Sequence, residues 1–177
     1  MKLLTAFLIL SIFGIPVFAQ PADFPVSWEG NWKGDLKIYA PESSEPKMQI
    51  PMELHIQPKN DSVWHWEIHY LTENPDIRRY ELIRDLKSNQ WKIDEKNGII
   101  LPQTFTGNRM QSVFSLDKTL LVATYWLENG LLNFEIIITQ TAAESNTGLG
   151  DETSPYVGNH PLTGYHKAVL KRNDSGN

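Results

Sequence analysis

The chain contains no cysteine among its 177 residues. Disulfide bonds, thiol catalysis, thiolate metal sites and attachment through a lipid-modified cysteine are therefore excluded. Hydrophobic packing and the hydrogen bonds of secondary structure must stabilise the fold instead. A chain of this length normally forms one domain, and it is long enough to bury a substantial core.

Positive charge is scarce as well. Sixteen Lys and Arg residues stand against 21 Asp and Glu residues, which gives a net charge of −5 at pH 7. Proteins that bind nucleic acid present a basic surface to the phosphate backbone. We therefore expect no nucleic-acid partner.

Long hydrophobic runs are missing except at the very beginning of the chain. Lys2 precedes a largely apolar run that reaches Ile15, and Val17 and Ala19 supply small residues where a signal peptidase reads them. This run of about 13 residues is shorter than the roughly 20 that a membrane-spanning helix needs. We predict a cleaved signal peptide over residues 1–19 and a single mature domain over residues 20–177. The product is expected to be secreted or periplasmic, with no membrane insertion after cleavage.

Helical periodicity is absent from the mature chain, whereas alternation of apolar and polar residues recurs in short segments. This alternation indicates strands with one buried face, and Asn129-Gly130 is typical of a tight hairpin. About ten strands in sequential hairpins favour an all-β fold, an antiparallel up-and-down barrel, because closure removes exposed sheet edges. Residues 140–163 show no period, so we predict a long loop there.

The Asn129-Gly130 turn fixes an expected register. It places Tyr125 opposite Phe134 on an apolar face that we predict to be buried, and Trp126 opposite Asn133 on the other face. For residues 77–84 the alternation does not decide which face is buried.

Aromatic and thioether side chains gather on one face of the hairpin that turns at residues 58–61. Such side chains could line a pocket for a small apolar or planar ligand, because ligand pockets are mostly apolar. Simple core packing is the other interpretation. The predicted ligand-binding residues are Trp64, Trp66, Tyr70, Met52 and Tyr125.

The opposite face of the same hairpin carries three histidines and two glutamates. If His55 pairs with His65, then Glu53 lies opposite Glu67, and His69 shares their side of the sheet. This group could bind zinc or copper. Polar residues are also what a solvated outer face requires, and we favour that interpretation, with no resident metal.

Two adjacent arginines, Arg78 and Arg79, lie in the predicted strand over residues 77–84. In a regular strand one of them must point inward. A buried arginine would need a carboxylate partner, such as Glu81, Glu135 or an acidic ligand. A bulge or strand end that exposes both side chains is the alternative.

Common enzyme motifs are also missing: there is no Gly-x-Ser-x-Gly elbow, no phosphate-binding loop and no His-Glu-x-x-His sequence. We therefore favour non-catalytic binding of a small apolar ligand, and we expect no cofactor. The alternatives are a structural or interaction module with a packed interior and an enzyme that uses the barrel mouth.

The segment from Gly30 to Gly34, with Trp32 at its centre, resembles the Gly-x-Trp opening of lipocalins and the wider calycin group. In that group the tryptophan closes one end of the barrel and a basic residue of a late strand packs over it. The resemblance therefore implies this structural role for Trp32, with Arg172 or Lys171 as its partner.

A ten-strand barrel without added helices is more similar to the nitrobindin branch of that group, although Leu36 stands where its motif has a final glycine. Nitrobindin-like proteins hold haem through a late histidine. Here His160 and His166 are the late histidines, and neither lies in a matching motif. We therefore expect a solvent-facing role for them and no haem.

Overall fold

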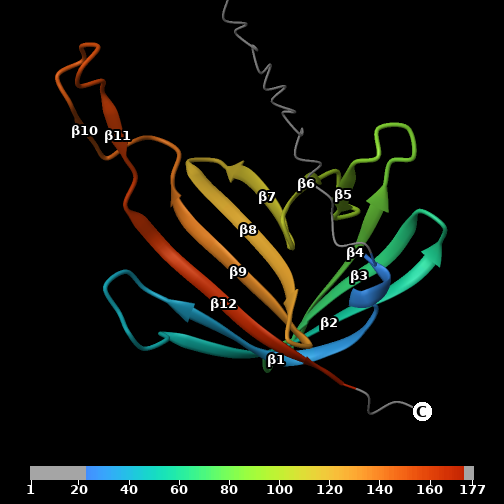
Figure 1. The fold of residues 1–177 in the computed structure, drawn as a ribbon. Helices are drawn as coiled ribbons and strands as arrows, with labels where there is room; N and C mark the ends of the chain where they lie inside the picture. The colour runs from blue at the N-terminus through green and yellow to red at the C-terminus, as the bar shows by residue number, and fades with distance from the viewer. Residues whose placement is uncertain (1–22, 174–177) are drawn as a thin grey trace, which may run out of the picture.

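The computed structural model describes residues 23–173, and it shows a closed barrel of ten antiparallel strands (Figure 1). The strands pair around the barrel in the order β1, β12, β9, β8, β7, β6, β5, β4, β3, β2. This confirms the predicted all-β up-and-down barrel. The strands are β1 (Gly30–Tyr39), β2 (Met48–Asn60), β3 (Val63–Tyr70), β4 (Asp76–Arg84), β5 (Trp91–Asp94), β6 (Ile100–Thr106), β7 (Arg109–Leu116), β8 (Thr119–Glu128), β9 (Leu131–Gln140) and β12 (Leu162–Arg172).

Three short elements complete the described chain. A 3₁₀ helix, η1 (Val26–Trp28), precedes β1, and β10 (Ser145–Thr147) pairs with β11 (Val157–Asn159) as a separate two-stranded sheet. Among the described residues, no helix is long and apolar enough to cross a membrane. The predicted signal peptide, residues 1–19, lies outside the described residues.

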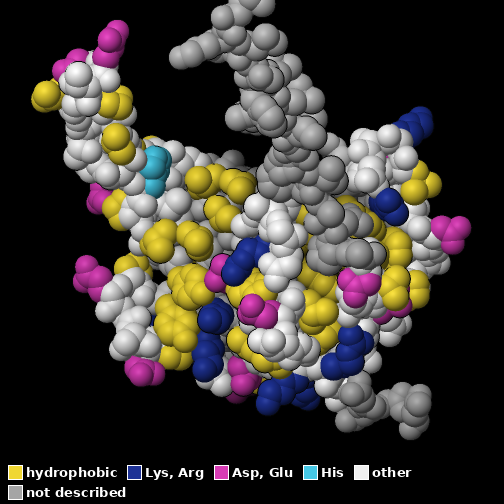
Figure 2. Space-filling view, in the orientation of Figure 1, with side chains coloured by type: hydrophobic (Ala, Val, Ile, Leu, Met, Phe, Trp, Pro, Cys, Tyr) yellow, Lys and Arg dark blue, Asp and Glu magenta, His cyan; other side chains and the backbone are white. Residues whose placement is uncertain are grey.

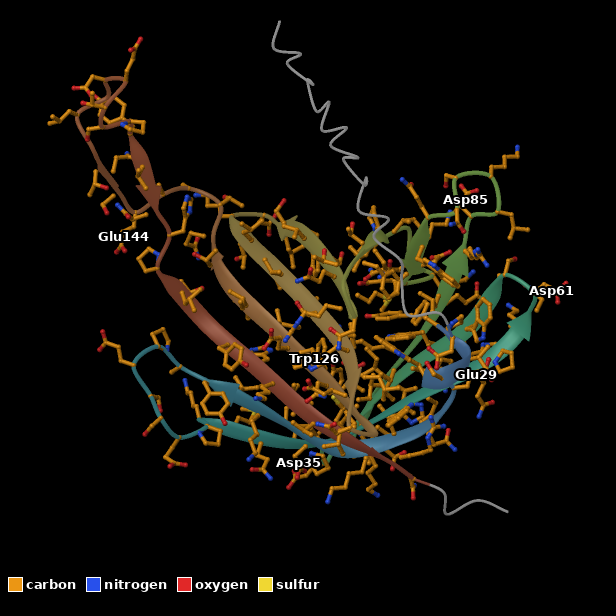
Figure 3. The ribbon with its side chains drawn as sticks, in the orientation of Figure 1. Glu29, Asp35, Asp61, Asp85, Trp126 and Glu144 are labelled. Carbon is orange, nitrogen blue, oxygen red and sulfur yellow. The ribbon has the colours of Figure 1, made fainter. Side chains whose placement is uncertain are left out.

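The sheet of β10 and β11 projects from the barrel wall, with Glu144 near its base (Figures 1 and 3). It occupies the segment 140–163, for which the sequence predicts a long loop. Both faces of this small sheet contact solvent, and almost every residue in it is exposed. A strand with no buried face needs no apolar alternation, which is why the sequence pattern does not reveal it.

The β8–β9 hairpin has the predicted register. Tyr125 pairs with Phe134 and Trp126 with Asn133, and the rings of Tyr125 and Phe134 stack with centroids 4.4 Å apart inside the barrel. Trp126 points outward but is still buried, because the guanidinium of Arg109 lies over its ring at 4.2 Å. Figure 3 labels this tryptophan on the strand.

The β2–β3 hairpin differs from the expected pairing. His55 pairs with Glu67 and Glu53 with His69, while His65 lies opposite Gln57. The reason is a tight turn closed by Asn60 and Val63, with an irregularity between residues 58 and 60 that shifts the register. The shift gives each residue a different partner on the other strand, but every side chain stays on the face of the sheet where it was expected.

Strand β4, whose faces the alternation leaves undecided, turns its even-numbered residues inward. Leu82 pairs with the buried Trp64 and is itself fully buried, whereas Ile77 is exposed. The same parity places Tyr80 and Arg78 on the inner side, toward the start of the strand.

One end of the barrel is filled by aromatic side chains. Phe24 packs edge-on against Trp28, Trp91 and Phe105, with ring centroids 4.7–4.9 Å apart. The short helix η1 carries Trp28 into this end beside the start of β1 (Figure 1). Because strands alternate in direction, the opposite end collects the last residues of β1 and the first residues of β2.

Candidate ligand-binding cavity

An interior cavity lies toward the end of the barrel opposite the aromatic filling. It offers about 110 Å³ to the centre of a water molecule. Its wall is mainly apolar, with aromatic side chains contributed by five strands. These aromatic residues are Trp66, Tyr70, Tyr80, Phe114, Tyr125 and Phe134.

The space exists because two small residues face the interior at the same level of the wall. Ser112 on β7 and Ala123 on β8 are direct cross-strand partners, and both line the cavity. Neighbouring inward positions on the same strands carry Phe114 and Tyr125, which are much larger. Small side chains at adjacent inward positions leave a hollow that the rigid sheet does not close.

The predicted ligand-binding residues fall into two groups. Trp66, Tyr70 and Tyr125 line the cavity. Trp64 and Met52 are buried but are not part of the cavity wall. Trp64 belongs to the filled end, where its ring lies 5.6 Å from that of Trp91.

Two buried polar atoms belong to residues of the cavity wall. They are Nε1 of Trp66, which lies beside the hydroxyl of Tyr125, and Oγ of Ser112, which has no hydrogen-bond partner within the described chain. Both are buried, and a buried polar group without a partner is energetically costly.

The tyrosines of the cavity stay protonated at neutral pH. Burial raises the pKa of Tyr70 and of Tyr80, and it raises the pKa of Tyr125 well above the ordinary value. A neutral phenol can donate one hydrogen bond and accept others. These rings thus combine an apolar surface with a polar tip.

Arg78 stands at the rim of the cavity. Its Nε and Nη2 atoms each lie 3.0 Å from Oδ2 of Asp76, and its guanidinium lies 5.4 Å from the centre of the Tyr70 ring. Arg78, not Arg79, is therefore the arginine on the inner side of β4, and its carboxylate partner is Asp76 rather than Glu81 or Glu135. About half of its side chain is exposed, so it remains accessible at the mouth.

The sequence did not identify Ser112, Ala123, Phe114 and Tyr80 as cavity residues. Tyr80 lies on a strand whose buried face the alternation leaves undecided, and Ser112 and Ala123 are small, whereas the predicted pocket residues are large. Ser112 and Ala123 could have been found from the sequence. Both are small residues at inward positions, and the turn at residues 117–118 makes them cross-strand partners.

At the filled end, Arg172 covers Trp32. Its guanidinium lies 4.5 Å from the centre of the indole ring, and it donates hydrogen bonds to the carbonyl oxygens of Ser27, at 2.9 Å, and Glu29. Trp32 in turn donates from Nε1 to the carbonyl oxygen of Trp28 at 2.8 Å. Of the two candidate basic residues, Arg172 occupies this place.

The two motif glycines beside Trp32 make room for these contacts. A Cβ atom on Gly30 would lie 2.6 Å from Nη1 of Arg172, and Gly30 has a φ of 130°, which few other residues adopt. A Cβ atom on Gly34 would lie 2.5 Å from the carbonyl oxygen of Val169. A larger residue at position 30 would displace the side chain of Arg172, and one at position 34 would push the backbone of β12 away.

The two late histidines lie in different environments. His160 is exposed, and its Nδ1 is 3.0 Å from the carbonyl oxygen of Gln140. His166 is level with Ile38 and Ile136 on the inner side of β12, and burial lowers its pKa. The expectation that His166 faces solvent is therefore wrong, because its position in the β12 alternation turns it inward. It does not belong to the cavity wall.

The histidine-rich face of β2 and β3 forms part of the outer wall. Glu53, His55 and His69 come together there, whereas His65 lies further along β3 and is not part of this cluster. Figure 2 shows the molecule in the orientation of Figure 1. Hydrophobic side chains gather in the middle of the visible face, and several Lys and Arg side chains lie along its lower edge.

Comparisons with known proteins identify no family for this chain. No protein-family profile matches it, and no curated protein matches it by sequence. Among solved structures, a variant of the fluorescent protein UnaG is similar with a TM-score of 0.45 and 13% identity, over 85% of this chain and 99% of that one. Zebrafish ileal bile-acid-binding protein complexed with cholic acid has a TM-score of 0.40 and 10% identity, over 83% and 99%. Likeness at this level carries no inference about function.

Proposed function

We propose that this protein is an exported, non-catalytic barrel that binds a small apolar or planar ligand in its interior cavity. The observation that carries the proposal is the hollow between Trp66, Tyr70 and Tyr125, in a barrel whose other end is filled. A barrel that served only as a packed module would gain stability by filling this space, because cavities in a core are costly.

The size of the hollow indicates the size of the ligand. An interior cavity of about 150 Å³ is known to accept benzene, and the one here is somewhat smaller at about 110 Å³. A single ring or a short branched chain therefore fits without rearrangement. Larger ligands would have to extend through the mouth past Arg78.

The charged group at the rim favours a ligand with a polar end. Arg78 lines the cavity and offers a half-exposed cation there. A hydrogen-bond acceptor on the ligand would pair with it. Because Asp76 already neutralises part of the charge of Arg78, the cavity wall rather than the rim should supply most of the affinity.

We also propose that the barrel is related to the calycin group. The support is the opening Gly30-x-Trp32-x-Gly34 together with the packing of Arg172 on Trp32. This relation concerns how the filled end is built. It adds nothing about the ligand, because unrelated sites occur on one fold.

Fluorine NMR with single-ring probes tests the binding proposal. We expect 4-fluorobenzyl alcohol to show saturable changes in line width and shift when the protein is added. Comparison with 4-fluorobenzoate then measures how much the cation at the rim contributes.

A matched pair of variants localises the probe. Ala123→Phe fills the hollow and should abolish the saturable signal, whereas Val113→Phe adds the same ring to the outer face of the adjacent strand, where Val113 is 65% exposed, and should leave it intact. No saturable binding by either probe, or equal binding by both variants, would contradict the proposal.

Export is tested separately from binding. Expression of the whole chain in a host with a secretion pathway should give a processed product, and mass spectrometry of that product should show a chain that begins at Gln20, with or without cyclisation of this glutamine. A cytoplasmic product that retains residues 1–19 would contradict export without affecting the cavity.

A further inference from the structure

Two histidines and two glutamates form a compact square on the outer wall of the barrel. Glu53 and His55 are two residues apart on β2, and Glu67 and His69 are two residues apart on β3. Their cross-strand pairs, Glu53 with His69 and His55 with Glu67, place an imidazole opposite a carboxylate twice. Strand alternation points all four side chains away from the ligand cavity.

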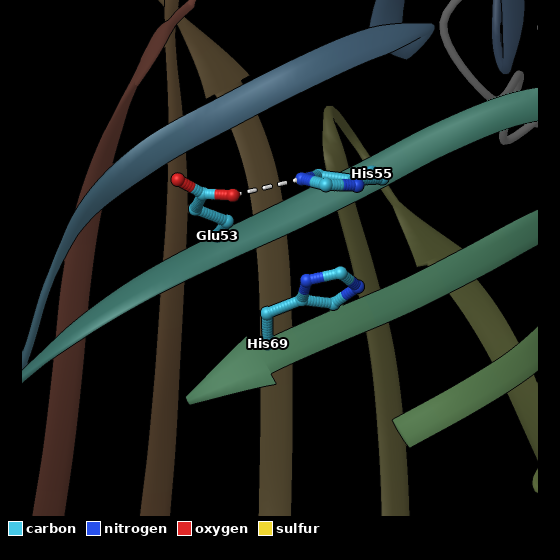
Figure 4. Close-up of side chains that lie close together, drawn as sticks. All are labelled: Glu53, His55 and His69. Atoms are coloured by element: carbon cyan, nitrogen blue, oxygen red, sulfur yellow. Dashed lines mark hydrogen bonds and ion pairs between the residues drawn. The ribbon is translucent and has the colours of Figure 1, made fainter. Parts of the chain in front are cut away.

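Three of these side chains already approach one another. Glu53, His55 and His69 each offer one ligand atom within 4.8 Å of the others, and Nε2 of His55 lies 3.1 Å from Oε2 of Glu53 (Figure 4). The rings of His55 and His69 have centroids 4.4 Å apart. All three residues are partly buried.

These distances are close to those of a metal site. With metal–ligand bonds of about 2.0–2.1 Å, two ligands of a tetrahedral zinc ion lie about 3.3 Å apart. The contact between His55 and Glu53 is already at this spacing. A gap of 4.8 Å must shorten by about 1.5 Å to reach this spacing, which rotation about the side-chain bonds can provide while the hydrogen-bonded ladder of β2 and β3 keeps the backbones in place.

Glu53 is held ready for a cation by its neighbours. Lys33 contacts Oε1 at 3.3 Å, which leaves Oε2 toward the histidines. A neighbour that orients a metal-binding carboxylate in this way is a common feature of metal sites.

We propose that Glu53, His55 and His69 form a binding site for one divalent transition-metal ion of the zinc and copper class. Two imidazoles and one carboxylate are a preferred ligand set for these ions. The fourth position faces solvent and is available to water, with Glu67 at the edge of the site, where its Oε2 lies 3.3 Å from Nε2 of His69. The site is on the opposite side of the wall from the cavity, so it does not depend on the proposed ligand.

Calorimetric titration of the purified, tag-free protein with zinc chloride tests the site. We expect one ion to bind per chain. His69→Ala and His55→Ala should each weaken binding by more than about tenfold, because loss of even an orienting neighbour costs about 10- to 100-fold. His65→Ala is the matched control, since it removes an outward histidine of the same strand that is not in the cluster.

Three further measurements keep the test decisive. Circular dichroism and thermal melting of the metal-free variants should match the wild type, because the changed side chains lie on the outer wall. Electron paramagnetic resonance with copper(II) should show coupling to two nitrogen atoms in the wild type and to one in His69→Ala. A stoichiometry well below one ion, or an affinity loss in His65→Ala equal to that in His69→Ala, would overturn the proposal.

Discussion

Trp32 is held by one contact on the face of its ring and another at its N–H group. Arg172 covers the face of the ring, and Nε1 donates to a backbone carbonyl of η1. The guanidinium of Arg172 forms no ion pair with a carboxylate among the described residues. It interacts instead with two carbonyl oxygens and the indole face. One tryptophan thereby joins the beginning of β1, the end of β12 and the helix that precedes them.

Trp32→Ala should cost about 3–5 kcal/mol of the free energy of unfolding, because it removes a fully buried large side chain and leaves a cavity. Urea denaturation measures this. Trp126→Ala is the control: this tryptophan also lies beneath an arginine but on the outer face, so its loss should cost less. Binding of a fluorobenzyl probe should survive in both. An unchanged unfolding midpoint in Trp32→Ala would contradict the proposed closing role.

Glu81 connects neighbouring elements at the level of the strands. From β4 its carboxylate contacts Lys59 at the end of β2, at 2.5 Å, and Lys96 in the turn after β5, at 3.1 Å. Its side chain is 13% exposed, while the two lysines are about half exposed. The hydrogen bond from Lys59 is the main reason that the pKa of Glu81 is lowered, against a smaller opposing effect of burial.

This lowered pKa predicts a pH-dependent contribution to stability. Glu81 has its ordinary pKa of 4.5 in the unfolded chain and a lower pKa in the folded protein, so acid protonates the unfolded chain first. The stabilisation is therefore present above pH 4.5 and is lost as the pH falls through the lower folded pKa. Glu81→Gln should therefore lose about 1 kcal/mol at pH 7, a size limited by the exposed lysines, and lose less at pH 3. Urea denaturation at both pH values measures the difference. Glu144→Gln, in the exposed segment before β10, is the control, and an equal loss at both pH values in Glu81→Gln would refute the argument.

The whole barrel divides into a filled half and a hollow half. Aromatic residues from β1, β3, β5 and the segment before β1 occupy the first. In the second, small inward residues on β7 and β8 leave the cavity. Stability and binding should therefore respond to changes in different halves.

Two inward alanines test this division. Ala168, between Leu36 and Phe134 in the register, is buried in the core, whereas Ala123 lines the cavity. Ala168→Leu should destabilise the protein by about 1–3 kcal/mol through overpacking. Ala123→Leu should be neutral or add up to about 1 kcal/mol by filling space. Thermal unfolding of both variants measures this, and equal destabilisation would show that the interior has no usable hollow.

The sequence by itself determined the barrel and much of its inner face. Alternation with period two and the Asn129-Gly130 turn predicted the strands and the β8–β9 register, because a tight turn and one buried face leave a single arrangement. The same reasoning placed Trp66 and Tyr125 inside. These properties depend on neighbours along the chain or across one hairpin, so local pattern is sufficient.

Only the tertiary structure decided which inward residues enclose space and which outward residues meet. The hollow depends on Ser112 and Ala123 being cross-strand partners opposite Trp66, and no local pattern reports volume across a barrel. The cluster of Glu53, His55 and His69 depends on the β2–β3 register, which an irregularity near residue 58 shifts from the expected pairing. The inner side of β4 was likewise fixed by pairing with β3 rather than by its own residues. Each of these outcomes requires strands to be in contact, because distances between side chains are set by the ladder and not by the order of residues.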